Sequence, residues 1–296
     1  MPELPEVQTL VDDLNRAGLA GAVFTGARVF WQRSVAVPAP HVFCRRLKGR
    51  RIRDIRRRGK FIVFDLSDGG HLMIHLRMSG RLHLVASGSK RSKHEHVLLC
   101  LGARQLRLHD TRKFGRVFLV EDDRAILGPL GVEPLEKGFT AAAFGKLLRA
   151  RKRMIKPLLL DQTVIAGLGN IYADESLWDA RIHPCRLSNT LTSKEIRALH
   201  RAIPRALTCG LENLGTSLGT GKANFYSIAR HRGRNQDCLQ VFRRTGEPCP
   251  RCRTPIERII VGQRSTHVCP RCQPLEAKLG QPSNPHNSAQ RKCLKL

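Results

Sequence analysis

The first six residues, MPELPE, place a secondary amine next to two carboxyl groups. Removal of Met1 would leave Pro2 with a free amine, which can attack an electrophilic sugar carbon and form an iminium. An α-amino group titrates near pH ~8, so part of it is neutral at physiological pH. Glu3 and Glu6 are candidates for a general acid and for a group that organises the amine locally. The simpler interpretation is a helix start with acidic residues in its first turn.

The segment from residue 5 to residue 17 is predicted to be the helix that positions this amine. Its apolar residues recur at helical spacing, at Val7, Leu10, Val11 and Leu14. A proline such as Pro5 suits the first turn of a helix. The positive end of the helix dipole would face the amine and disfavour its ammonium form. The local structure is therefore compatible with attack by the N-terminal amine.

A second group of residues with a chemical role lies near the carboxyl end. It consists of the pair Cys249 and Cys252, followed by the pair Cys269 and Cys272. Four thiolates at this spacing can surround zinc tetrahedrally, and the metal then stabilises a small module. Residues 255–260 and 264–268 are predicted to form its β-hairpin. The other cysteines are scattered and are expected to be ordinary thiols in a reducing compartment.

The charge of the chain indicates a polyanionic partner. Lys and Arg number 52 against 24 Asp and Glu, which gives a net charge of +28. Such an excess favours nucleic acid over a membrane surface as the partner. No apolar stretch approaches the roughly 20 residues of a membrane span. The acidic N-terminus has no apolar signal core, which predicts a cytoplasmic location.

The pattern of apolar residues divides the chain into regions. Alternating runs predict strands over 61–66, 71–76, 96–101, 105–109 and 116–120. These strands are expected to form an antiparallel β-sandwich crossed by the N-terminal helix. Helical spacing follows a linker over 121–138, and a glycine-rich turn before Asn170 could approach a phosphate.

We therefore expect an α+β multidomain protein with an N-terminal β-sandwich and its leading helix, a helical domain and a C-terminal β-hairpin zinc finger. The expected boundaries are 1–130 for the catalytic β-sandwich domain, 131–240 for the helical DNA-binding domain and 241–273 for the zinc finger. Residues 274–296 have the composition of a disordered tail.

Five segments of the chain resemble the formamidopyrimidine-DNA glycosylase family of bifunctional base-excision enzymes. They are PELPEV at the start, RRGKF at 57–61, HLRMSG at 75–80, DTRKFG at 110–115, and DQTVIAGLGNIYADESLWDARIHP at 161–184. The resemblance extends to Cys272. It implies that the helical domain is a helix-two-turn-helix domain and that the zinc is structural.

The resemblance assigns the chemistry to Pro2, Glu3, Lys60 and Arg264. Pro2 would be the nucleophile and Glu3 would protonate the sugar ring oxygen. Lys60 would transfer a proton during strand cleavage; it opens the apolar run 61–64, which would hold it in place. Arg264 would grip a phosphate beside the lesion and assist the second elimination.

The resemblance also implies a set of DNA-contacting residues. Met78, Arg112 and Phe114 would fill the hole left by an extruded base, as apolar wedges and arginines do in other DNA-binding proteins. The other contacts would be made by His94, Arg151, Lys156 and Asn170. A loop over 215–240 would close over the base, although it fits the family pattern poorly between 219 and 238. Thr111 stands where the family more often has Pro.

The implied function is the excision of oxidised purines from duplex DNA, followed by β,δ-elimination at the abasic site. The partner would be damaged double-stranded DNA, and the protein would be a cytoplasmic monomer with one zinc and no membrane contact. One alternative is an endonuclease VIII-like glycosylase for oxidised pyrimidines, which the segments PELPEV, HLRMSG and DTRKFG disfavour. Another is a non-catalytic zinc-finger DNA-binding protein, which would leave Pro2, Glu3 and Lys60 unexplained.

Overall fold

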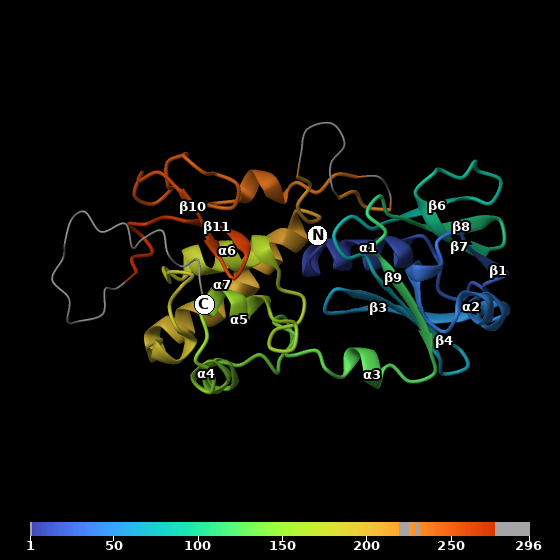
Figure 1. Ribbon diagram of the computed structural model, residues 1–296, viewed down its shortest axis with the longest axis horizontal. Coiled ribbons are helices and arrows are strands. Elements are labelled where there is room, and N and C mark those ends of the chain that lie inside the picture. Colours follow the sequence, from blue (N-terminus) through green and yellow to red (C-terminus); the bar gives the residue numbers. More distant parts are fainter. Residues whose placement is uncertain (1, 219–224, 229–230, 276–296) are drawn as a thin grey trace. The chain divides into compact units, whose positions relative to one another are not determined.

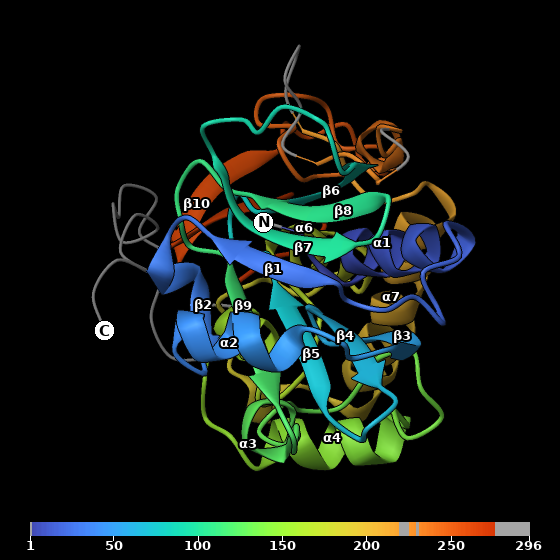
Figure 2. The same ribbon diagram turned by 90° about the vertical axis from the view of Figure 1, so that its right-hand side faces the viewer.

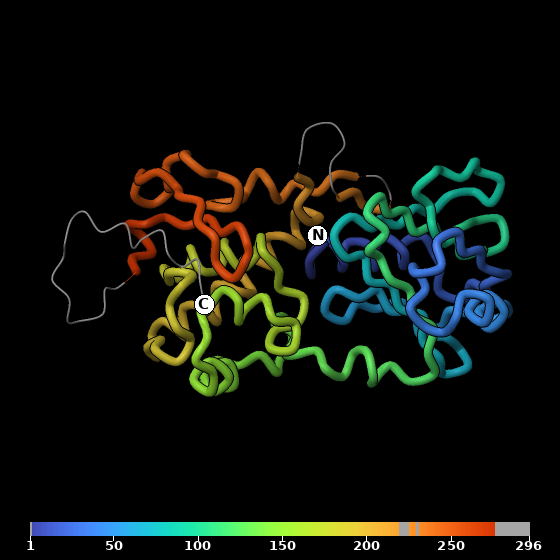
Figure 3. The backbone as a smooth tube through the Cα atoms, viewed as in Figure 1, coloured from blue at the N-terminus to red at the C-terminus, as the bar shows by residue number. Residues whose placement is uncertain are grey.

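The computed structural model describes residues 2–218, 225–228 and 231–275. Figures 1 and 3 show the course of the chain. The chain forms two compact units: unit 1 is Met1–Leu130 with Gly210–Asp237, and unit 2 is Gly131–Cys209 with Cys238–Leu296. Met1 and residues 276–296, which are most of the tail expected to be disordered, lie outside the described residues.

Unit 1 contains two β-sheets, seen in Figure 2. One has the strand order β2-β9-β5-β4-β3 and the other the order β1-β7-β8-β6. Neighbouring strands are antiparallel, except that β2 and β9 are parallel. The strands are β1 Gly26–Val29, β2 Val35–Val37, β3 Ile52–Arg58, β4 Phe61–Leu66, β5 His71–His75, β6 Arg81–Ala86, β7 Glu95–Leu101, β8 Arg104–His109 and β9 Arg116–Val120.

The two sheets share one apolar core, which makes unit 1 a β-sandwich. Phe64 and Ile74 of the first sheet belong to the same buried cluster as Leu99 and Leu106 of the second. Helix α1, Leu4–Arg16, packs against β3 and β4 and adds its apolar stripe to this cluster. The predicted β-sandwich with a leading helix is confirmed.

Several elements of unit 1 have no clear pattern in the sequence. Strand β3 reads IRDIRRR, and only its two isoleucines are buried. Strands β1 and β2 have four and three residues, which is too short for a reliable alternation. The shorter helices are α2 Pro40–Leu47, α3 Arg124–Leu127 and the 3₁₀ turn η1 Gln32–Ser34.

The segment Gly210–Asp237 belongs to unit 1, whereas the sequence pattern placed it in the helical domain. Its Phe225 is buried in the core of the β-sandwich, with 3% of its surface exposed. The long helix α7, Ser193–Glu212, runs into this segment from unit 2. Because helical periodicity is a local signal, it does not show that the chain returns to the first unit after α7.

Unit 2 is built on helices and one β-hairpin. Helix α6 packs against α5 and against strand β11 of the hairpin, and it is buried from Ile171 to Trp178. A helix buried on all sides accounts for its weak amphipathic pattern. The elements are α4 Ala141–Arg149, α5 Ile155–Leu160, α6 Asn170–Asp179, η2 Ser188–Thr190, most of α7, β10 Glu257–Val261 and β11 Arg264–Val268. The 3₁₀ turn η3, Asn235–Cys238, belongs to unit 1 except for its last residue. None of the helices in the described ranges is both long and apolar enough for a membrane crossing.

Candidate active site

The N-terminal residues of unit 1 are buried and held by a helix cap. Pro2 is buried, and Glu3 exposes only 2% of its surface. Glu3 is the N-cap residue of α1, and its backbone N–H donates to Oε2 of Glu6 at 2.8 Å. This reciprocal capping fixes the direction in which the chain enters the helix. The amine-bearing residue and Glu3 therefore have a defined place.

Glu6 also holds the segment that returns from α7. Its Oε1 accepts the backbone N–H of Thr216 at 2.7 Å. Gly215 lies against the same side chain, because a Cβ added there would be 2.8 Å from Cγ of Glu6. Gly215 also has φ +81°, which favours glycine. Since both carboxylate oxygens accept backbone N–H groups, Glu6 acts as the local organiser that the sequence suggested.

The described part of the 215–240 segment is tied together by its own side chains. Nδ2 of Asn235 donates to Oγ1 of Thr216 at 2.8 Å. Oγ of Ser217 donates to the carbonyl of Phe225 at 2.7 Å and accepts the N–H of Gly233 at 2.9 Å. Residues 219–224 and 229–230 lie outside the described residues. The base of the expected lesion loop is thus anchored on Glu6.

Lys60 lies in the two-residue turn between β3 and β4, and 5% of its surface is exposed. The turn is linked to α1 through Arg57. The guanidinium of Arg57 donates to Oε1 of Gln8 at 3.0 Å and to the carbonyl of Gly59 at 3.1 Å. These bonds connect the early turns of α1, which carries Pro2 and Glu3 at its start, to the turn that carries Lys60.

His75 is a candidate residue that the sequence reasoning missed. It pairs with Phe61 across β4 and β5, directly after the Lys60 turn. Burial, followed by the positive charges of Arg77 and Lys60, lowers the pKa of His75 to about 3. Its Nδ1 accepts the N–H of Arg77 at 3.0 Å, so the neutral ring carries its proton on Nε2. The pairing of β4 with β5, which places His75 opposite Phe61, could have identified His75 as a neighbour of Lys60.

The two loops expected to fill the void are shaped by one buried acid. The carboxylate of Asp110 accepts the backbone N–H groups of Arg112 at 3.1 Å and Gly115 at 2.6 Å, and also the hydroxyl of Ser79. Met78 and Phe114 remain exposed, at 38% and 44% of their surfaces. They are therefore not folded into the core, and they stay available as wedges.

Arg112 and His94 lie at the same end of the second sheet. The Arg112 guanidinium lies over the ring of Phe114, 4.7 Å from its centroid. The His94 ring lies 5.7 Å from that of His109 and 6.4 Å from that of His96. The DNA contacts of Met78, His94, Arg112 and Phe114 remain predictions.

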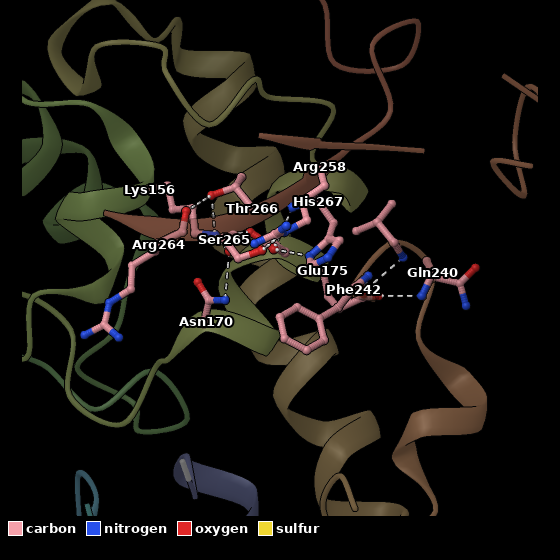
Figure 4. A network of polar contacts seen from close by, with 12 residues as sticks. Lys156, Asn170, Glu175, Gln240, Phe242, Arg258, Arg264, Ser265, Thr266 and His267 are labelled. Atoms are coloured by element: carbon pink, nitrogen blue, oxygen red, sulfur yellow. Dashed lines mark hydrogen bonds and ion pairs between the residues drawn. The ribbon is translucent and has the colours of Figure 1, made fainter. Parts of the chain in front are cut away.

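Unit 2 carries a separate polar network, drawn in Figure 4. Lys156 is fully buried and forms an ion pair with Asp174, with 2.6 Å between Nζ and Oδ1. Its Nζ also donates to the carbonyl of Ser265 at 3.0 Å and to Oγ1 of Thr266 at 2.7 Å. Because these partners occupy the ammonium group, Lys156 positions strand β11. Its direct contact with DNA remains a prediction.

Asn170 joins the same network from the first turn of α6. Its Nδ2 donates to the carbonyl of Ser265 at 2.9 Å. Ser265 follows Arg264, whose exposed side chain projects away from the network in Figure 4. The hydrogen bonds from Lys156 and Asn170 to the carbonyl of Ser265 therefore fix the backbone next to Arg264. The contacts of Asn170 and Arg264 with DNA remain predictions, as does that of Arg151, which donates to the carbonyl of Leu147 at 3.0 Å.

The tip of the hairpin is a tight turn pressed against α5. Gly262 and Gln263 have φ of +55° and +59°, the signs that a type I′ turn requires. A Cβ on Gly262 would be 2.8 Å from Cγ of Pro157. This close approach holds Arg264, the next residue but one, at the edge of α5.

Two adjacent acids on α6 anchor different parts of unit 2. Oδ2 of Asp174 accepts the backbone N–H of His267 at 2.9 Å. The carboxylate of Glu175 accepts the N–H groups of Gln240, Val241 and Phe242 at 2.8 to 3.0 Å. Burial raises the pKa of Glu175, although these three donors act to lower it. The hairpin and the segment that leads to it are thus fixed on one helix.

The four cysteines near the carboxyl end meet at one point. The ligand atoms of Cys249, Cys252, Cys269 and Cys272 all lie within 4.8 Å of one another. Sγ of Cys252 lies 3.4 Å from that of Cys269, and Sγ of Cys249 lies 3.9 Å from that of Cys272. Tetrahedral zinc with Zn–S bonds of about 2.3 Å requires sulfurs about 3.8 Å apart. The four thiolates fit this ion, which would tie the two ends of the module together.

Comparison with known proteins gives matches along most of the chain. Residues 1–117 match the model of the formamidopyrimidine-DNA glycosylase N-terminal domain, and residues 130–221 match that of its H2TH domain. Residues 246–275 match a zinc finger found in FPG and IleRS. This match and the sulfur geometry identify a structural zinc site.

Similar proteins are found among curated sequences and solved structures. A formamidopyrimidine-DNA glycosylase of Protochlamydia amoebophila is 46% identical over 92% of this chain and 99% of its own length. A formamidopyrimidine-DNA glycosylase of Herpetosiphon aurantiacus is 44% identical over 92% of this chain and 100% of its own length. A Lactococcus lactis FPG mutant in complex with Fapy-dG-containing DNA superposes with a TM-score of 0.86 at 37% identity, covering 93% of this chain and all of that chain.

The chain belongs to the formamidopyrimidine-DNA glycosylase family. It is a DNA glycosylase of base excision repair, and its macromolecular partner is DNA.

Replacing Lys156 tests its positioning role. Lys156→Met should destabilise unit 2 by about 3–5 kcal/mol, because Asp174 would stay buried without its counter-charge. Lys156→Met combined with Asp174→Asn should recover much of this loss, since the asparagine is neutral. Urea unfolding followed by circular dichroism measures both. Lys152→Met, at an exposed lysine nearby, is the control. Weaker DNA binding by Lys156→Met at unchanged stability would instead support direct contact.

Removing one zinc ligand should release the metal. Cys269→Ser is expected to lower zinc from one ion per chain to near zero and to weaken DNA binding, while the β-sandwich stays folded. Elemental analysis and duplex titration measure these effects, with Cys185→Ser as the control outside the site. Purified wild-type protein without zinc would contradict the assignment.

Proposed function

We propose that the chain excises oxidised purines from duplex DNA and then cleaves the strand at the abasic site, with Pro2 as the nucleophile. The observation that carries the proposal is the buried N-terminal arrangement. Pro2 and Glu3 precede a helix whose Glu6 holds both the Glu3 N–H and the Thr216 N–H. An amine held in one position beside a buried carboxyl group is suited to covalent catalysis.

The proposed reaction begins at the sugar of the extruded nucleotide. The Pro2 nitrogen bonds to C1′ while Glu3 donates a proton to the ring oxygen. The base departs with the electrons of its bond to C1′ and takes up a proton, and an iminium remains between Pro2 and the opened sugar. The iminium acidifies the protons on C2′, so the 3′ phosphate and then the 5′ phosphate leave by elimination. Hydrolysis finally frees Pro2.

In unit 1, Lys60 is proposed to transfer a proton during strand cleavage, and His75 is proposed to bind a phosphate group of the DNA. They are close in the fold, because Phe61, the residue after Lys60, pairs with His75 across β4 and β5. A neutral His75 with its proton on Nε2 can donate a hydrogen bond to a phosphate oxygen. Arg264, Asn170 and Arg151 are proposed to contact the DNA backbone from unit 2. Met78, Arg112 and Phe114 are proposed to occupy the space left by the base.

The purine preference rests on the relatives. Solved Lactococcus lactis complexes contain Fapy-dG DNA and abasic-site DNA. Another contains an oxidised pyrimidine, so some activity on pyrimidine lesions is a second candidate function. We also propose that the protein acts as a monomer without membrane contact in the cytoplasm, where its four zinc thiolates stay reduced.

Glu3→Gln should separate the two activities. An intact nucleoside needs ring-oxygen protonation before the sugar can be attacked, whereas a pre-formed abasic site already presents an aldehyde. Base excision should therefore fall by about 10²–10⁴-fold, the usual contribution of a general acid, and far more than abasic-site cleavage. Single-turnover assays on both substrates measure this.

Glu136→Gln provides the control for Glu3→Gln at an exposed glutamate. Equal losses on the two substrates would show that Glu3 chiefly positions the amine. In that case the proton donor would have to be a different group, with Glu6 the first to be tested by the same substitution.

A further inference from the structure

Unit 1 contains a pocket of about 450 Å³ beside the second sheet. We call it the aromatic–basic pocket. The residues that follow β1, the loop that leads into β7 and the loop that follows β8 contribute to it. Its lining residues are Phe30, Trp31, Arg91, Lys93, His94, His96, Thr111 and Lys113. His94 is predicted to contact DNA, and the proposed reaction uses none of these side chains.

Two of its cations are held on aromatic rings. The guanidinium of Arg91 lies 4.0 Å from the centroid of the Phe30 ring, and Nζ of Lys113 lies 4.0 Å from that of Trp31. Phe30 exposes 48% of its surface, which is unusual for a phenylalanine. Because the cations already cover the rings, the rings serve as supports for the cations rather than as platforms for stacked bases.

The positive charge of the pocket is not neutralised within the described part of the chain. No acidic side chain lines the pocket there, and Arg91, Lys93 and Lys113 form no ion pair with those residues. Glu95, the acid nearest in sequence to Arg91 and Lys93, is buried, and its Oε2 accepts from Arg107 at 3.0 Å and from the N–H of Ser92 at 2.9 Å. Asp110, the acid nearest to Lys113, is also buried and accepts backbone N–H groups. Nη1 of Arg91 donates to the carbonyls of Ser92 at 3.2 Å and Glu95 at 3.1 Å, which fixes the guanidinium without neutralising its charge. The charges of the three cations are therefore available to an external anion.

The backbone presents Lys113 in an unusual conformation. Its φ is +59°, in the left-handed region that side chains other than glycine and asparagine seldom adopt. The strain is held by Asp110, whose carbonyl accepts the Lys113 N–H at 3.3 Å and whose carboxylate holds Arg112 and Gly115. Conformations of this kind persist where a surrounding structure over-determines them, often at binding sites.

The neighbours of the pocket indicate which anion it binds. Lys113 stands between Arg112 and Phe114, the residues proposed to enter the duplex. A DNA strand that meets these two side chains would continue past the same loop. Its phosphates would then follow one another at regular intervals beside the pocket. A lone small anion would need no such series of cations. The pocket therefore fits the sugar–phosphate backbone.

We propose that Arg91, Lys93 and Lys113, supported by Phe30 and Trp31, form a clamp for backbone phosphates of the duplex outside the lesion nucleotide. The clamp rests on the proposed function only in requiring that the partner is duplex DNA. It adds affinity that is independent of the lesion and of the sequence.

The salt dependence of binding to undamaged duplex tests the clamp. Each phosphate contact contributes about 0.9 to the slope of log K against log salt concentration. Arg91→Gln combined with Lys113→Gln should therefore reduce the magnitude of this slope by about 1.8. Lys48→Gln combined with Arg53→Gln removes the same charge from exposed residues outside the pocket and should leave the slope nearly unchanged. Equal slopes for the first variant and wild type would overturn the proposal.

Two further measurements locate the clamp. Phe30→Leu with Trp31→Leu keeps the charges but removes the supports, so it should weaken binding as well; unchanged affinity would count against the role of the rings. Duplexes shortened stepwise on each side of a tetrahydrofuran abasic-site analogue, which has no aldehyde for Pro2 to attack, should abolish the difference between wild type and the Arg91→Gln, Lys113→Gln variant. A difference that persists on the shortest duplex would refute binding outside the lesion. Binding to undamaged DNA or to this analogue involves no catalysis, so these results are independent of the Glu3→Gln comparison.

Discussion

The structure of unit 1 depends on a single buried carboxylate, that of Glu6. One oxygen accepts the N–H of Glu3 and the other accepts the N–H of Thr216, so the start of the chain and a segment 210 residues later are fixed by one group. Removing a partner of a buried charge is costly because the charge is left without compensation. The proposed nucleophile and the base of the proposed lesion loop thus share one anchor.

In unit 2, too, buried carboxylates accept backbone N–H groups from distant segments of the chain. Asp174 and Glu175 are adjacent on α6, and each accepts backbone N–H groups from a segment far along the chain. Asp174 also neutralises Lys156, which in turn holds the strand that begins at Arg264. The zinc site then closes the far end of the same module. In both units, buried acids fix the backbone segments that carry residues proposed to contact DNA.

The elements and sites that could be predicted are those that produce a recognisable pattern over a short stretch of sequence. The amphipathic stripe of α1, the short apolar runs of β4 and β5 and the paired cysteines all belong to this class. The partners of Glu6 and the burial of Lys156 could not be predicted, because they depend on contacts between residues far apart in the chain. A lysine followed by Pro157 in a basic stretch reads as a surface residue, and only the fold reveals the acid that neutralises it. His75 was missed for the same reason, since its neighbour Lys60 is brought to it by strand pairing.

The amine of Pro2, fixed by the Glu6 cap, is proposed to form the covalent bond to DNA. Borohydride reduction during reaction with a duplex that contains a single 8-oxoguanine converts the iminium into a stable amine, which can be located by peptide mapping. A protein–DNA adduct at Pro2 is expected, and an extra residue retained before Pro2 should prevent its formation while duplex binding survives. An adduct located at Lys60 would show instead that Pro2 is not the nucleophile.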